Sequence, residues 1–333
     1  MKNDQNNAGQ DLLELLASMD ERSASDLYIC EGKVPAARIH GHVHTIGDTP
    51  SSKAQLMQLL DRVLAGTAKG RFERAGDIDV GYSLADGRRF RLNVARQQGR
   101  YAVVARAVPS GALSFEELGL PPAVENLAER RRGLVIVTGA TGSGKSTTLA
   151  AMVHHINKTR PVHVVTIEDP IEYQHHDDVA RITQREVGGD TASYQQALRH
   201  VVRQSPDVIL VGEMRDVESI QVVLAAALTG HLVLTTLHTI DAAQTVQRIL
   251  RYFPDHLRTQ VAMDISQCLQ GIVSQRLLPR TDEQGRILAA EVMHNTPPVA
   301  RLLREQRLDE LQDLMRASRN PGLITFNESL LQL

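Results

Sequence analysis

Aromatic side chains are scarce in this sequence. It contains no tryptophan, and only 3% of its residues are aromatic. Recognition of nucleobases or sugars by stacking depends on aromatic faces, so this composition argues against that class of function. The charges nearly cancel, because 37 Lys and Arg oppose 39 Asp and Glu. A chain without a basic surplus is not expected to be a dedicated nucleic-acid binder or a polybasic membrane anchor.

Cysteine and long apolar runs are also nearly absent. Cys30 and Cys268 are too few to form a disulfide framework or a four-thiolate zinc site, and sparse thiols suit a reducing compartment. The longest apolar stretch, 222–237, is interrupted from Thr229 to His231 and is shorter than the roughly 20 residues of a membrane span. The polar start of the chain lacks the apolar core of a signal peptide. We therefore expect a cytoplasmic protein without a transmembrane segment.

The N-terminal part of the chain has the pattern of a small α+β domain. Short apolar or alternating segments are separated by turn residues such as Gly41 and Gly87, which is typical of strands in an antiparallel sheet. Apolar residues recur at helical spacing within 53–65, and Asp11 is positioned to cap an earlier short helix. The strands that this pattern predicts are 27–30, 37–46, 78–84, 88–95 and 101–107.

The C-terminal part alternates between apolar runs and longer helical patterns. Runs of β-branched residues separated by helices predict a parallel sheet that is covered on both faces. Pro109 and Gly111 interrupt the periodicity between the two parts. We expect a domain over 1–108, a linker over 109–118 and a second domain over 119–333, since a length of 333 residues suits two domains of roughly 150 residues. The strands expected in the second domain are 134–138, 162–167, 208–211 and 232–236.

The strongest motif is G-x-x-x-x-G-K-[ST], which fits residues 139–146 without deviation. It follows a predicted strand and precedes a predicted helix, a context that a chance glycine-rich turn would lack. In such a loop, backbone N–H groups converge on phosphate oxygens, Lys145 reaches the β- and γ-phosphates, and Ser146 offers its hydroxyl to Mg²⁺. The motif therefore predicts binding of ATP with Mg²⁺. The expected nucleotide-binding residues are Gly139, Thr141, Gly142, Ser143, Gly144, Lys145, Ser146 and Thr147.

Two acidic residues follow predicted strands of the same domain. Glu213 lies just beyond the strand 208–211, where a carboxylate can hold Mg²⁺ or polarise the attacking water. Glu168 follows the strand 162–167, and Pro170 ends that strand so that the carboxylate is presented at its tip. We expect Glu168 to act as the general base and Glu213 to orient Mg²⁺-bound water, and the exchange of these two roles is the alternative. Surface acids at strand ends are the simpler alternative.

Two histidines flank the last of these predicted strands. His231 precedes it and His238 follows it. An imidazole close to the γ-phosphate can report whether that phosphate is present, so both histidines are candidate catalytic residues. The alternative is that each histidine is a hydrogen-bonded structural residue.

Taken together, these segments resemble the type II/IV secretion ATPases, and most closely the type IV pilus retraction ATPases of the PilT and PilU family. The resemblance rests on the P-loop, the run Thr-Ile-Glu-Asp-Pro-Ile-Glu, the run Gly-Glu-Met-Arg-Asp and the strand with two histidines, in this order. The blocks that the family calls Walker A, Asp box, Walker B and His box fall on 139–147, 164–173, 207–216 and 229–239.

The resemblance implies an α/β fold in which a smaller α+β PAS-like domain precedes a RecA-like P-loop ATPase domain. It also implies a homo-hexamer, with ATP between the two domains and arginines of the N-terminal domain closing the site. The stretch 71–106 carries eight arginines against four acids. Within it, Arg91, Arg96 and Arg106 are candidates to neutralise phosphate charge in the manner of an arginine finger.

The function that the resemblance implies is an ATP-hydrolysing motor that powers type IV pilus retraction and twitching motility. The expected partners are an inner-membrane platform protein and a paralogous retraction ATPase, met at the inner face of the cytoplasmic membrane. No nucleic acid is expected as a partner.

Two alternative functions stay open. One is a retraction paralogue that binds nucleotide with little hydrolysis, because residues 203–207 resemble the PilU pattern while Gly-Glu-Met-Arg-Asp resembles that of PilT. The other is a secretion or assembly ATPase of the same superfamily. Assembly members usually carry a four-cysteine zinc motif, and two isolated cysteines therefore favour retraction.

Overall fold

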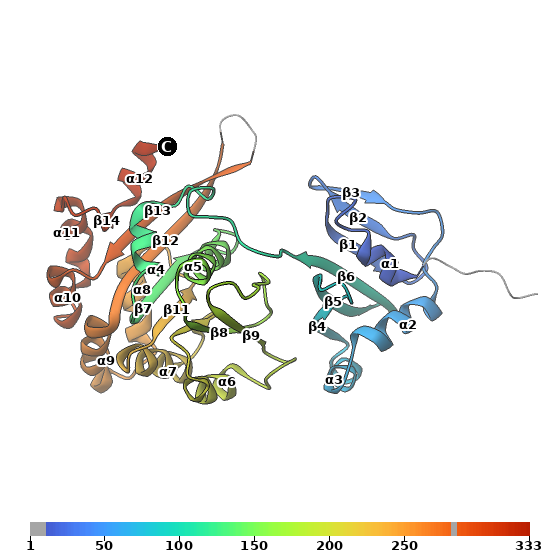
Figure 1. The fold of residues 1–333 in the computed structure, drawn as a ribbon, viewed down its shortest axis with the longest axis horizontal. Helices are drawn as coiled ribbons and strands as arrows, with labels where there is room; N and C mark the ends of the chain where they lie inside the picture. The colour runs from blue at the N-terminus through green and yellow to red at the C-terminus, as the bar shows by residue number, and fades with distance from the viewer. Residues whose placement is uncertain (1–10, 281–284) are drawn as a thin grey trace, which may run out of the picture. The chain divides into compact units, whose positions relative to one another are not determined.

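The computed structural model describes residues 11–280 and 285–333, whose contacts group them into two units (Figure 1). The first unit comprises the residues up to Ser110 together with Pro170–Gln174 and Gly188–Asp190. The second comprises Gly111–Asp169, His175–Val187 and Thr191–Leu333. Within the described ranges, no helix has the length and apolar character needed to cross a membrane.

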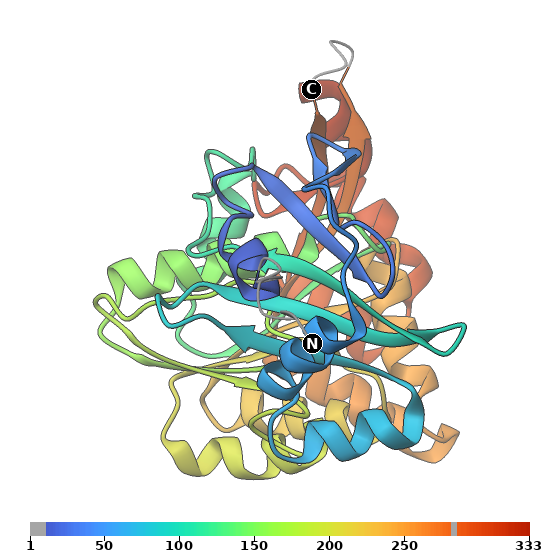
Figure 2. The same ribbon diagram turned by 90° about the vertical axis from the view of Figure 1, so that its right-hand side faces the viewer.

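A six-stranded sheet forms the centre of the first unit, and its strand pairs are antiparallel, as the sequence predicts. The strands, coloured blue to teal in Figure 2, lie side by side in the order β3-β2-β1-β6-β5-β4. They are β1 (Ala24–Cys30), β2 (Ala36–Ile39), β3 (His42–Thr45), β4 (Asp77–Ser83), β5 (Arg89–Gln97) and β6 (Arg100–Val108). The helices are α1 (Leu12–Ala17), α2 (Lys53–Val63) and α3 (Thr67–Ala75).

Alternation along β5 explains how this sheet is held. Phe90, Leu92 and Val94 are buried, whereas the residues between them are partly exposed, because side chains of a strand point to opposite faces in turn. The buried face shares one apolar core with the leucines of α1 and α2. Asp11 caps α1 by accepting a hydrogen bond from the Leu13 N–H at 3.0 Å, which confirms the predicted start of that helix.

Two features of the first unit differ from the predicted pattern. The segment 37–46, expected as one strand, is divided between β2 and β3 because His40 and Gly41 take positive φ angles of 48° and 83° and turn the chain back. The helix α3 has no counterpart among the predicted elements. Only Ala68 and Phe72 are buried in it, so its sequence carries a weak apolar pattern.

An eight-stranded sheet forms the centre of the second unit, in the order β14-β13-β12-β7-β11-β10-β8-β9. The pairs from β12 to β9 are parallel, which confirms the parallel sheet expected from the sequence. At one edge, β13 and β14 continue the sheet with antiparallel pairs that the sequence pattern does not predict. The strands are β7 (Gly133–Gly139), β8 (His163–Glu168), β9 (Arg181–Glu186), β10 (Val208–Val211), β11 (Leu232–Leu237), β12 (Leu269–Pro279), β13 (Arg286–His294) and β14 (Leu323–Ile324).

Helices cover both faces of this sheet. In β7, Leu134 and Ile136 belong to the apolar core shared with α6, α7, α8 and α9, whereas Val135 and Val137 belong to the core shared with α4 and α5. Burial on both faces is the reason that these strands are continuously apolar. The helices are α4 (Pro122–Ala128), α5 (Lys145–Thr159), α6 (Tyr194–Val201), α7 (Val217–Leu228), α8 (Ala242–Arg251), α9 (Asp255–Cys268), α10 (Pro297–Arg304), α11 (Leu311–Ala317) and α12 (Phe326–Gln332), with short 3₁₀ turns at Val202–Gln204 and Leu308–Glu310.

The strand register determines where the functional residues lie. Thr138 at the end of β7 pairs with Leu237 at the end of β11. Val211 at the end of β10 pairs with Ile167 of β8. The segments that follow these four parallel strands therefore leave the sheet at the same edge, which is the usual location of ligand sites in parallel α/β sheets.

Candidate functional site

The P-loop connects β7 to α5 within the second unit. Gly139 ends the strand with a φ of +147°, and an added Cβ there would lie only 2.6 Å from the Gln275 carbonyl oxygen. Gly144 precedes α5 with a φ of +93°, a conformation that glycine adopts without strain. These backbone requirements explain two of the glycines in the motif. The loop delivers the chain to a helix N-terminus, which is a ready binding site for phosphate.

Lys145, the first residue of α5, is buried, and its side chain turns back toward the P-loop. Its Nζ donates hydrogen bonds to the carbonyl oxygens of Gly139 and Ala140, each at 3.0 Å. The same Nζ lies 3.5 Å from Nδ1 of His238. The ammonium group is thus held at the phosphate-binding edge. Ser146 and Thr147, the other predicted phosphate- and Mg²⁺-binding residues of this turn, are half-buried in the first turn of α5.

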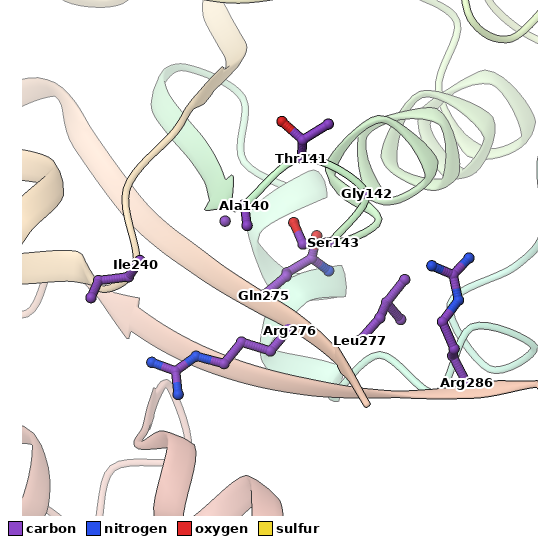
Figure 3. A pocket seen from close by; sticks show the side chains of 10 residues that line it. Ala140, Thr141, Gly142, Ser143, Ile240, Gln275, Arg276, Leu277 and Arg286 are labelled. Atoms are coloured by element: carbon purple, nitrogen blue, oxygen red, sulfur yellow. The ribbon is translucent and has the colours of Figure 1, made fainter. Parts of the chain in front are cut away.

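A hollow of about 410 Å³ lies beside the P-loop. Figure 3 shows the P-loop residues along one side of it and residues of β12 across from them. Arg276 and Arg286 are among its lining residues, and the Arg276 guanidinium lies over the Phe326 ring, 4.1 Å from the ring centre. The volume is within the range of small-molecule sites, and the positive charge suits an anionic ligand. The lining residues are Gly139, Ala140, Thr141, Gly142, Ser143, Ile240, Gln275, Arg276, Leu277 and Arg286.

Glu213 follows β10 and lies at the same edge. Its Oε1 is 3.4 Å from Nε2 of His238, and its Oε2 accepts a hydrogen bond from Nε of Arg215 at 2.9 Å. Arg215 also reaches Asp169, with 3.5 Å between Nη1 and Oδ2. One imidazole therefore stands between Lys145 and Glu213. A cation, an imidazole and a carboxylate that lie side by side in this order can respond together to the charge of a phosphate group.

Glu168 ends the neighbouring strand β8. Its Oε1 accepts hydrogen bonds from Thr166 Oγ1 at 2.8 Å and from Gln184 Nε2 at 3.2 Å. These two contacts orient the carboxylate from its own strand and from β9. Both predicted acids are therefore at one edge of the sheet, and Glu213 contacts His238, which in turn lies beside Lys145.

His231 lies apart from this group, because it precedes β11 rather than following it. Its carbonyl oxygen accepts a hydrogen bond from Gly133 N at 2.9 Å, at the start of β7. Its Nδ1 lies 3.0 Å from the Ala226 carbonyl oxygen. A strand of this length spans about 20 Å at roughly 3.3 Å per residue, so His231 is out of reach of a phosphate held by the P-loop of its own chain.

The three arginines expected to approach the nucleotide are engaged within the first unit. Arg106 pairs with the buried carboxylate of Asp26 at 2.7 Å. Arg96 lies over the rings of Phe72 and Tyr101 at 5.7 and 5.9 Å. The third, Arg91 on β5, lies 3.8 Å from Asp79.

Several residues at the site were not found by sequence reasoning. Gln275 donates a hydrogen bond to Thr148 Oγ1 at 2.7 Å, below the P-loop. It belongs to β12, a strand that the apolar pattern does not distinguish, so no signal in the sequence points to it. Arg215 falls inside the Gly-Glu-Met-Arg-Asp run, and its charge between acids is a signal that was available.

Comparison with known proteins places this chain among secretion and pilus proteins. A family described as "Type II/IV secretion system protein" covers residues 8–320. The "Type IV pilus retractation ATPase PilT" of Pseudomonas aeruginosa is 39% identical over 320 residues, which are 96% of this chain and 93% of that protein. The "Type IV pilus ATPase PilU" of the same organism is 41% identical over 320 residues, 96% of this chain and 84% of that protein.

The fold gives the same result. The crystal structure of "the Pilus Retraction Motor PilT and Bound ADP" superposes with a TM-score of 0.87 at 40% identity, over 98% of this chain and 97% of that chain. The "Legionella pneumophila ATPase DotB" superposes with a TM-score of 0.75 at 27% identity, over 99% and 97%. The α/β architecture predicted from the sequence is confirmed by these likenesses.

Proposed function

This chain belongs to the type II/IV secretion system protein family, and we propose that it is an ATP-hydrolysing motor that powers the retraction of type IV pili. The observation that carries the proposal is the series Lys145, His238 and Glu213 at the P-loop edge of the sheet. Support for the pilus as the object of the work comes from relatives, since proteins named for pilus retraction and for twitching motility share 39% and 38% of their residues with this chain over nearly its whole length.

Different residues of the second unit have different roles in ATP hydrolysis. Backbone N–H groups from Gly139 to Gly144 bind the phosphates, and Lys145 exchanges its carbonyl partners for the β- and γ-phosphate oxygens. The hydroxyl of Ser146 and the carboxylate of Glu213 are oxygen donors of the kind that Mg²⁺ prefers, and Mg²⁺ would neutralise charge on the phosphates when bound. Glu168, oriented by Thr166 and Gln184, accepts the proton of the attacking water.

The assembly that we propose is a homo-hexamer bound at the inner face of the cytoplasmic membrane. The domains extend over 1–108 and 119–333, joined by a linker over 109–118, and Arg91, Arg96 or Arg106 closes the nucleotide site from the N-terminal domain. An inner-membrane platform protein and a paralogous retraction ATPase are its partners. The existence of PilT-like and PilU-like relatives in one organism supports a paired system.

Substitution of Lys145 tests the proposed activity. Lys145→Ala removes the cation that meets the β- and γ-phosphates, so phosphate release by the purified full-length chain should fall by roughly 100-fold or more. Lys158→Ala, an exposed lysine of the same helix, is the matched control and should retain wild-type turnover. Normal phosphate release by Lys145→Ala would refute the assignment of this site.

A second candidate function is a nucleotide-binding paralogue with little hydrolysis of its own. It is favoured by the 41% identity to a PilU protein, which is close to the 39% identity to a PilT protein. Negligible turnover together with tight ATP binding would support this alternative over the motor. Deletion of the gene separates both from an assembly ATPase, because loss of retraction leaves pili on the surface without twitching, whereas loss of assembly removes the pili.

A further inference from the structure

Two acids of α4 and one histidine of α5 come together in the second unit, away from the P-loop. Glu125 and Glu129 are four residues apart, a spacing that places them on the same face of a helix. One ligand atom from each of Glu125, Glu129 and His155 lies within 4.8 Å of the other two. His155 lies about 15 Å along α5 from Lys145, at 1.5 Å per residue, so this group is separate from the nucleotide site.

The spacing between His155 and Glu125 resembles that of two ligands of one metal ion. Nδ1 of His155 lies 3.7 Å from Oε1 of Glu125. This distance exceeds the limit of roughly 3.2 Å for an ordinary hydrogen bond. Two ligands of a tetrahedral Zn²⁺, each roughly 2.0–2.2 Å from the ion, are roughly 3.4 Å apart. A small rotation of the Glu125 side chain, which is 46% exposed, is therefore enough to place both atoms around one ion.

The packing around these side chains holds the two helices in place. α4 and α5 share one apolar core. The Phe115 ring lies against the imidazole of His155, with 5.3 Å between the ring centres. Arg160, the residue after α5, donates from Nη1 to the carbonyl oxygens before and after Glu129, at 3.3 and 3.1 Å. The ligands therefore need little further ordering to bind an ion, which favours binding.

The charges at this end of α4 also favour a bound cation. Glu125 and Glu129 lie in the last turn and at the C-cap, where the helix dipole disfavours negative charge. Within the described part of the chain, Glu125 forms an ion pair only with His155, and the Glu129 carboxylate forms none. The arginines at 130–132 offset the two negative charges at longer range, so a cation is held here only by direct coordination. An imidazole with two carboxylates suits Zn²⁺ better than Mg²⁺ or Ca²⁺, which prefer oxygen ligands alone.

We propose that Glu125, Glu129 and His155 bind a divalent transition-metal ion of the zinc type, with water completing the coordination. The ion joins α4, which leads into β7, to α5, which begins at the P-loop, and so stabilises the folded second unit. This inference goes beyond the proposed function and does not depend on ATP hydrolysis.

Calorimetric titration of the metal-free, full-length chain with ZnCl₂ is the first test. The chain has 13 histidines, so the readout is the zinc equivalent that a variant loses relative to the wild type. His155→Ala and Glu129→Gln should each weaken binding of one equivalent by about 100-fold, because even residues that only orient a ligand contribute 10–100-fold to metal affinity. His256→Ala, at an exposed position of α9, is the matched control and should keep wild-type binding. Unchanged zinc binding by both variants would overturn the inference.

Thermal unfolding gives a second readout and guards against a variant that folds poorly. Glu129 is exposed, so Glu129→Gln should melt at the wild-type temperature in the absence of metal. ZnCl₂ at about 100 times its dissociation constant should raise the melting temperature of the wild type by about 5 °C, and MgCl₂ should not. Glu129→Gln should lose this rise. An equal rise in the variant and the wild type would overturn the site.

Crystals grown with equimolar ZnCl₂ test the location of the ion. An anomalous-scattering peak roughly 2.0–2.2 Å from all three side chains would support the site. A peak that forms only in large zinc excess marks an adventitious ion only and would overturn the inference, as would peaks confined to other histidines. Zinc binding at this site in a chain that releases no phosphate from ATP would support the inference while refuting the proposed motor.

Discussion

At the scale of single residues, His175 has a shifted pKa and lies on a segment that contacts the candidate site. Burial lowers its pKa from 6.5 to about 4, with smaller contributions from His154 and His176. Its backbone N–H donates to Gln184 Oε1 at 2.8 Å, and Gln184 in turn donates to Glu168. A neutral, half-buried imidazole therefore lies on the segment that holds Gln184, which orients one of the two acids.

This pKa predicts a loss of stability in acid. Between pH 6.5 and about 4 the unfolded chain binds a proton that folded His175 excludes, so the stabilisation is complete above pH 6.5 and is lost as the pH falls toward 4. Urea unfolding at pH 7 and pH 5 should show that His175→Gln loses about 2 kcal/mol less than the wild type over this interval. His42→Gln, at an exposed position of β3, is the control and should follow the wild type. Identical pH dependence of His175→Gln and the wild type would contradict the burial argument.

At the scale of elements, a buried acid connects two helices to the sheet. Glu291 of β13 is 2% exposed. It accepts hydrogen bonds from the Ala242 N–H at 2.9 Å, at the start of α8, and from Gln312 Nε2 of α11 at 3.2 Å. The segment before α8 carries His238, so this contact helps to place the histidine of the site. Burial raises the pKa of Glu291 above its ordinary value of 4.5 even though both hydrogen bonds act in the opposite direction.

The sign of this shift predicts the behaviour of Glu291→Gln. A raised pKa in the folded state means that the protonated form is the favoured one, so its contribution to stability is complete below pH 4.5 and is lost as the pH rises through the folded-state pKa. The neutral amide of Glu291→Gln keeps an acceptor for Ala242 and lacks that loss. Its free energy of unfolding relative to the wild type should therefore increase from pH 5 to pH 8 in urea titrations. Glu116→Gln, at an exposed position, should show no such trend. A difference that stays constant with pH would refute the assignment.

At the scale of the whole molecule, the near balance of charge conceals a separation. The stretch 71–106 has eight arginines against four acids, within a chain whose net charge is −2. At the P-loop edge, by contrast, the carboxylates of Glu168, Asp169 and Glu213 lie near two positively charged side chains, Lys145 and Arg215. An ATP triphosphate bound at this edge requires further positive charge. Head-to-tail contacts between copies of a chain form a ring when the rotation from one copy to the next closes.

The proposed ring is tested by sedimentation. Six copies of a 36.7 kDa chain have a mass of about 220 kDa, and we expect this species in the presence of ATP with Mg²⁺. Lys145→Ala should reach the same mass only at higher nucleotide concentration, because it loses affinity for the phosphates. A monomer under all nucleotide conditions would contradict the motor.

The sequence by itself determined the local chemistry of this protein. The P-loop could be predicted because its glycines, Lys145 and Ser146 act through the backbone geometry of one short segment, and the parallel strands could be predicted because burial on both faces makes them continuously apolar. The turn at His40 and Gly41 and the helix α3 were missed, since their local signals are weak and packing decided them.

Only the tertiary structure decided which of these residues meet. His231 and His238 flank one strand and are equivalent in the sequence, but parallel pairing with β7 brings only His238 to Lys145. Gln275 reaches the site from a strand that no motif marks, because strand order joins residues that are far apart along the chain. Local backbone conformation depends on neighbouring residues in the sequence, whereas the contacts of a side chain depend on the long-range packing of the whole sheet.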